Sequence, residues 1–75
     1  MPIKVLIADD ALFMRNMIKD VFSGEDFEVV GEAANGVEAV EKYKELSPDI
    51  TTMDIVMPQK SGIEAVREIV KMDKE

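Results

Sequence analysis

Short apolar runs alternate with amphipathic segments along this chain, and the alternation restricts the folds that the chain can adopt. The run at 3–8 is almost continuously apolar, which is typical of a strand covered on both faces. The segments between the runs carry apolar residues at helical spacing. Strands that alternate with helices of this length form right-handed β-α-β units around a parallel sheet. The expected strands cover residues 3–8, 27–33 and 49–54, and the expected helices cover residues 11–22, 36–46 and 62–72.

Local signals support these boundaries. Asn35 and Gly36 form a cap or turn signal before the second helix, and Gly24 is expected as the C-cap of the first. The two glutamates within 27–33 favour an edge position for that strand, because charge blunts unwanted strand pairing. The first helix is expected to place three of its apolar side chains in the core, namely Phe13, Met14 and Met17.

The length and composition exclude several classes of protein. With 75 residues the chain forms one small domain, 1–75. It has no cysteine, which excludes a disulfide and a thiolate zinc site. It has no histidine either, which excludes imidazole metal ligands, a histidine general base and a serine-histidine-aspartate triad.

The charge of the chain limits its partners. The formal net charge is −7, and an acidic protein is poorly suited to binding nucleic acid, which depends on Lys and Arg. It is equally unsuited to anionic membranes, and no apolar run approaches the ~20 residues of a membrane span. The N-terminus enters the first expected strand without a signal-peptide pattern, so we expect a cytoplasmic protein.

Carboxylates follow two of the expected strands. Asp9 and Asp10 end the first run, and Asp54 ends the third. In an open parallel sheet, ligands bind outside the carboxyl ends of the strands, where the strand order reverses. If the two strands are neighbours, the three carboxylates converge there, and an oxygen-only cluster suits a hard divalent cation such as Mg²⁺. Two alternatives stay open, because Asp9 or Asp10 could cap the first helix and Asp54 could be a loop carboxylate without chemistry.

Three stretches together resemble a known family. They are Asp-Asp-Ala-Leu-Phe-Met-Arg at 9–15, Gly-Glu-Ala-Ala-Asn-Gly at 31–36 and Met-Asp-Ile-Val-Met-Pro at 53–58. At these separations the chain resembles, over its whole length, the receiver domain of two-component response regulators, and most of all those of chemotaxis. The resemblance implies an α/β, flavodoxin-like, doubly wound fold. The chain would form half of it, with the parallel strand order 2-1-3.

The resemblance also implies a role for each site residue. Asp54 would be the phosphoacceptor. Asp10 and Asp54 would bind Mg²⁺ directly, the backbone carbonyl of Val56 would be a third protein ligand, and Asp9 would act through a water. A histidine kinase would be the phosphodonor. Lys60 is expected to be a solvated loop charge and not a phosphate contact.

The family repeats the βα unit five times, and this sequence supplies three. The family's Thr or Ser after the fourth strand and Lys after the fifth, both of which contact the phosphoryl group, have no counterpart in the 75 residues. We therefore expect no enzyme, and impaired autophosphorylation, because removing charge-stabilising groups typically costs orders of magnitude in rate.

Three other functions compete with this interpretation. The first is an isolated or engineered half-domain that self-associates without signalling. Self-association is expected because strand 49–54 would lie at a sheet edge, and because helices 11–22 and 62–72 would leave apolar surface uncovered. We expect a homodimer, through pairing of strand 49–54 in the order 2-1-3-3′-1′-2′ or through exchange of an element. A nucleotide or flavin binder lacks support, since an Asp-Asp-Ala loop is no phosphate cradle. An aspartyl phosphatase normally has a second acid where Val56 stands.

Overall fold

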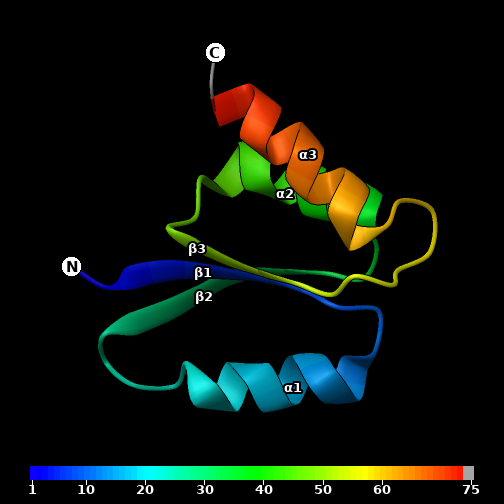
Figure 1. Ribbon diagram of the computed structural model, residues 1–75. Coiled ribbons are helices and arrows are strands. Elements are labelled where there is room, and N and C mark those ends of the chain that lie inside the picture. Colours follow the sequence, from blue (N-terminus) through cyan, green and yellow to red (C-terminus); the bar gives the residue numbers. More distant parts are fainter. Residues whose placement is uncertain (74–75) are drawn as a thin grey trace.

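The computed structural model describes residues 1–73 and contains a parallel sheet with helices on both faces (Figure 1). Residues 74 and 75, which end the expected domain, lie outside the described range. The strand order of the sheet, β2-β1-β3, confirms the predicted 2-1-3 arrangement. Within residues 1–73, none of the helices is long and apolar enough to cross a bilayer. The strands are β1 (Ile3–Ala8), β2 (Phe27–Ala33) and β3 (Ile50–Met53), and the helices are α1 (Leu12–Val21), α2 (Gly36–Leu46) and α3 (Gly62–Asp73).

Strand β1 is the centre of the sheet. Val5, Leu6 and Ile7 are fully buried, as expected of a strand covered on both faces. Ala8 is in register with Ala33 of β2 on one side and with Met53 of β3 on the other. The three parallel strands therefore end level with one another, at one edge of the sheet.

The helices divide unequally between the two faces. Figure 1 shows α1 on one face and α2 with α3 on the other. Val40 of α2 packs with Ala65 and Ile69 of α3, which joins these two helices into one layer. A second cluster at the carboxyl end of β1 contains Ala8, Ala33, Ala39 and Met57, so the segment after β3 also folds onto the core.

The expected cap of α2 is confirmed, and that of α1 is wrong. Asn35 accepts a hydrogen bond from the Glu38 amide at 2.9 Å through its side-chain oxygen, which satisfies a free donor of the first helical turn. Helix α1 instead ends before Phe22, whose φ of −102° is not left-handed, and Gly24 is not in a left-handed conformation either. The Phe22 ring packs edge-on against Phe27 at 5.0 Å between centroids, so a ring contact lies beside this turn.

The expectation that the apolar residues of α1 lie in the core is also wrong. Phe13, Met14 and Met17 are 72%, 41% and 49% exposed. Helix α1 approaches the sheet with a neighbouring face, on which Arg15 and Ile18 are half-buried.

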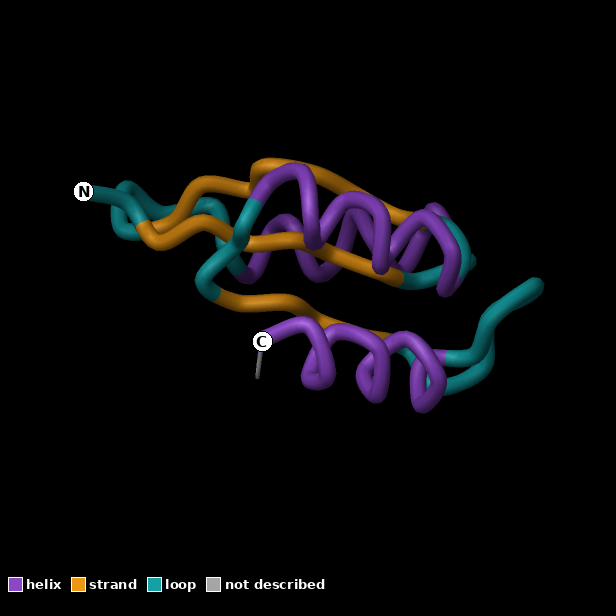
Figure 2. The backbone as a smooth tube through the Cα atoms, turned by 90° about the horizontal axis from the view of Figure 1, so that it is seen from above, coloured by secondary structure: helices purple, strands orange, loops and turns teal. Residues whose placement is uncertain are grey.

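Strand β3 pairs only with β1, and Figure 2 shows it at one edge of the sheet with α3 running alongside. Within residues 1–73, nothing covers the apolar face of α1 or the outer edge of β3.

Candidate functional site

Backbone hydrogen bonds bring the two acidic strand ends together. The Asp54 amide donates to the Ala8 carbonyl at 2.9 Å, and the Asp9 amide donates to the Ala33 carbonyl at 3.0 Å. The ladder thus continues one residue beyond each strand. Because the strands are parallel and level, the carboxylates that follow β1 and β3 meet at the same edge.

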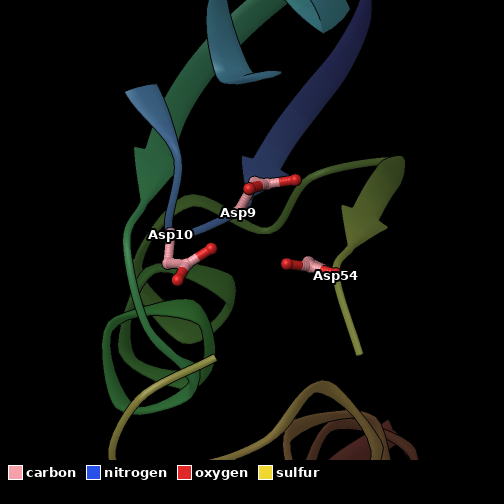
Figure 3. Close-up of side chains that lie close together, drawn as sticks. All are labelled: Asp9, Asp10 and Asp54. Atoms are coloured by element: carbon pink, nitrogen blue, oxygen red, sulfur yellow. The ribbon is translucent and has the colours of Figure 1, made fainter. Parts of the chain in front are cut away.

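Three carboxylates converge at this edge. Asp9, Asp10 and Asp54 each place a carboxylate oxygen within 4.8 Å of the others, and Figure 3 shows the three side chains pointing into a common space. Asp9 is buried, Asp54 is half-buried and Asp10 is exposed, so the cluster opens to solvent. These donors are all carboxylate oxygens, a set that fits a hard divalent cation such as Mg²⁺.

The alternative that Asp9 or Asp10 caps the first helix is confirmed only in part, and only for Asp9. The N-cap residue of α1 is Ala11, so neither aspartate occupies that position. One oxygen of Asp9 nevertheless accepts a hydrogen bond from the Ala11 amide at 2.9 Å, which stabilises the turn before the helix. Asp9 therefore has a structural role in addition to its place in the cluster, whereas the structure assigns no such role to Asp10.

The loop after Asp54 is held close to the sheet by two glycines. A Cβ atom at Gly62 would lie 1.9 Å from the Asp54 carbonyl oxygen, and one at Gly36 would lie 1.9 Å from the Lys60 carbonyl oxygen. The Gly62 amide also donates to the Ile55 carbonyl at 2.9 Å. Only glycine permits these approaches, so the two positions fix the path of the backbone on either side of the site.

Two predicted positions lie in this loop. Val56 is 78% exposed, two residues after Asp54, and the role of its carbonyl as a metal ligand stays a prediction. Lys60 is not simply a solvated charge, because its ammonium group pairs with the carboxylate of Glu68 in α3. That ion pair ties the loop to the helix that follows it.

The sequence did not reveal a polar cluster beside the acidic one. The Arg15 Nε donates to Glu32 at 3.0 Å, and the Lys19 ammonium donates to the other Glu32 oxygen at 2.9 Å. A second Arg15 nitrogen, Nη1, donates to the backbone carbonyl of Asp9 at 2.6 Å. Spacing gave no signal for this cluster, because Arg15 and Glu32 are 17 residues apart and meet only through the fold.

The sequence of the chain matches a described family. Residues 5–75 match the family model of the response regulator receiver domain. The chain belongs to the response regulator receiver family.

The most similar receivers include proteins of chemotaxis. The chain is 63% identical over 70 residues to the chemotaxis protein CheY of Thermotoga maritima, and this covers 93% of the chain but only 58% of that protein. The structure superposes on the response regulator domain of Thermotoga maritima CheB with a TM-score of 0.92 and 53% identity, covering 95% of this chain and 54% of the other. The chain thus spans little more than half the length of the receivers that it matches.

A third relative was crystallised with ligands. The CheX-CheY-BeF₃-Mg²⁺ complex from Borrelia burgdorferi matches with a TM-score of 0.91 and 40% identity, covering the whole of this chain and 57% of the other. Together, these comparisons confirm the predicted family and the half of the flavodoxin-like fold that the sequence predicts.

Substituting alanine for Gly62 is expected to destabilise the protein by roughly 2–3 kcal/mol, because the new Cβ would collide with the Asp54 carbonyl. Urea unfolding followed by circular dichroism measures the effect. Gly24→Ala is the control, since its Cβ would meet nothing within 4 Å and its φ is not positive, so the change should stay below ~1 kcal/mol. Equal stability of the two variants would contradict the described packing of the loop.

The Glu32 ion pairs are expected to make stability depend on pH. The hydrogen bond from Lys19, with a further one from Arg15, holds the pKa of Glu32 below its ordinary value of 4.5, although burial partly opposes this. A lowered folded-state pKa contributes stability above the ordinary value, and this contribution is lost as the pH falls from 4.5 through the lowered value.

Chemical unfolding of wild type and Glu32→Gln between about pH 6 and pH 3 tests this expectation. The variant should be less stable at the upper end, and the difference should shrink toward the lower end. Glu28→Gln, at an exposed position of the same strand, should leave the wild-type pH profile unchanged. A constant difference between wild type and Glu32→Gln would contradict the assigned ion pairs.

Proposed function

We propose that this chain is the phosphoaccepting part of a response regulator of the chemotaxis type, with Asp54 as the acceptor. The observation that carries the proposal is the convergence of Asp9, Asp10 and Asp54 at the carboxyl ends of β1 and β3. Membership of the receiver family supports it. So does the Borrelia burgdorferi CheY, whose structure contains BeF₃ and Mg²⁺.

Each site residue has a distinct role in this proposal. Asp10 and Asp54 hold Mg²⁺ directly, the Val56 carbonyl is a further ligand, and Asp9 acts through a water. When bound, the cation supplies positive charge that offsets the repulsion between the acceptor carboxylate and an incoming phosphoryl group. An Asp54 oxygen then forms a bond to phosphorus, while the bond from phosphorus to the leaving group breaks and its electron pair stays with the leaving group.

The proposed donor is a histidine kinase, and the proposed location is the cytoplasm. The 75 residues include neither the Thr or Ser nor the Lys that contact the phosphoryl group in the family. We therefore infer that this chain by itself accepts phosphate slowly, because the groups that would stabilise the transferred charge are not in it. It supplies the acceptor and the metal ligands, and it is not an enzyme acting on a separate substrate.

Self-association is the second candidate property, and the uncovered apolar surface favours it. Ile63, Val66 and Val70 of α3 are 52%, 43% and 47% exposed, and Ile55 after β3 is 61% exposed. A groove of about 250 Å³ lies between the end of β3 and α3. Exposed apolar patches and unpaired strand edges both mark association sites. A homodimer through β3, or through an exchanged element, would cover them.

The chain is expected to bind Mg²⁺ weakly, and Asp10→Asn should lower the affinity at least ~10-fold, because it removes a charged ligand. Titration followed by amide chemical shifts measures both dissociation constants. Asp20→Asn, an equal change of charge at an exposed position of α1, should bind like wild type. Equal affinity of wild type and Asp10→Asn would show that the cluster does not hold the cation as proposed.

Treatment with acetyl phosphate or beryllofluoride is expected to modify Asp54 alone, and poorly. Intact-mass spectrometry and fluorine NMR detect the two adducts, and Asp54→Asn should abolish both. A complete receiver domain provides the reference for the extent of reaction. Modification as extensive as in that reference would overturn the expected impairment, whereas modification of Asp54→Asn would overturn the choice of acceptor.

Sedimentation velocity over a range of concentrations should reveal a dimer, and Ile50→Lys should weaken it, because a lysine on the edge strand opposes pairing. Glu28→Gln changes the charge by the same amount on the opposite edge strand and should leave association unchanged. A monomer that unfolds cooperatively at ~10 μM would exclude the dimer at that concentration.

A further inference from the structure

The Arg15 side chain connects three parts of the molecule that meet at the acidic cluster. It belongs to α1, it pairs with Glu32 near the end of β2, and it donates to the backbone carbonyl of Asp9 just after β1. The Arg15 side chain is 15% exposed and that of Glu32 is 32% exposed, so the contacts are partly shielded from water. Hydrogen bonds in which one partner is charged are among the strong ones in proteins.

The carbonyl that Arg15 holds belongs to the peptide bond between Asp9 and Asp10. Because a peptide group is planar, fixing its oxygen also fixes its amide and the starting direction of Asp10. Two further contacts hold the same turn: the Asp9 amide donates to Ala33, and the Asp9 carboxylate accepts from Ala11. The first of these joins two backbone groups, and the second lies within the turn itself. Only the contact from Arg15 brings a side chain of a helix onto the turn.

The guanidinium group suits this task. Its nitrogens have a fixed planar arrangement, so Nε on Glu32 and Nη1 on the Asp9 carbonyl define both the position and the orientation of the group. Glu32 is held in the sheet by its pairing with Ile7 of β1, and its backbone carbonyl accepts from Lys42 of α2. The end of β2 is thus a firm anchor from which Arg15 reaches the turn.

We propose that Arg15 is a positioning residue for the acidic cluster. Anchored by Glu32, it fixes through the Asp9 carbonyl the turn that carries Asp9 and Asp10, and so sets the affinity of the cluster for a divalent cation. The inference rests on the proposed function, in which Asp10 and Asp54 hold Mg²⁺.

Simple electrostatics makes the opposite prediction, which gives the test a decisive sign. Arg15 is a cation near a site for a cation, so its charge alone opposes binding, and removing it should tighten Mg²⁺ binding. If Arg15 positions the turn, removing it should weaken binding. Lys19 is the matched control, because it carries the same charge on the same helix and pairs with the same glutamate at 2.9 Å, while its ammonium is bonded to Glu32 and not to the Asp9 carbonyl.

The experiment is a Mg²⁺ titration of the 75-residue chain, followed by amide chemical shifts. Arg15→Met is expected to raise the dissociation constant about 10-fold, the lower end of the roughly 10- to 100-fold range for residues that act through a ligand. Lys19→Met should bind as tightly as wild type or more tightly. Arg15→Lys, which keeps the charge but loses the planar fork, should also bind more weakly than wild type, and it serves where Arg15→Met fails to fold.

A second readout does not require the metal. The Ala11 amide donates to the Asp9 carboxylate, so its resonance reports on the turn directly. Without Mg²⁺, the Ala11 and Asp10 amide resonances should move in Arg15→Met and in Arg15→Lys, and should stay in place in Lys19→Met.

The outcomes separate the two proposals. If Asp10→Asn weakens binding while both Arg15 variants bind as tightly as wild type or more tightly, the role of Arg15 is refuted and the proposed metal site stands. If wild type does not bind Mg²⁺, the proposed site fails, and the affinity role of Arg15 fails with it. Amide resonances that do not move in either Arg15 variant would refute the hold on the turn in every case.

Discussion

The register of β1 with its two neighbours is the constraint on which the rest of this structure depends. Ala8 lies opposite both Ala33 and Met53, so the strands end level and the residues that follow them meet. A slip of β1 by one residue would move the charged Lys4 or Asp9 into a position that a buried apolar side chain now fills. The full burial of Val5, Leu6 and Ile7 resists such a slip. One apolar run therefore fixes the core and places Asp9 beside Asp54.

Most of the fold could be predicted because its signals are local. Strands 3–8 and 27–33 and helix 36–46 have the predicted bounds, and the other helices differ by one residue at their ends. The third strand is assigned only as Ile50–Met53, although the amides of Asp49 and Asp54 still bond to β1. The acidic cluster was equally predictable, since the carboxyl ends of parallel neighbours must meet.

The features that were mispredicted or missed depend on contacts across the fold. Helical periodicity identified an apolar face containing Phe13 and Met14, but periodicity does not say whether any element covers that face. The pairing of Arg15 with Glu32 arises only once α1 lies against β2. The need for glycine at position 62 likewise follows from the folded path of a loop, and not from any nearby sequence signal.

The two faces of helix α1 differ in what they contact, and this difference links the acidic cluster to the uncovered apolar surface. Its half-buried side contacts the sheet partly through Arg15 and Lys19, and ion pairs that remain partly exposed hold a helix less firmly than a buried apolar face does. Its apolar side, with Leu12 and Val21, is still exposed. A second chain that covered this side would restrain α1 and, through Arg15, the turn at Asp9. Association and cation binding would then favour one another equally, since coupling between two binding events is reciprocal.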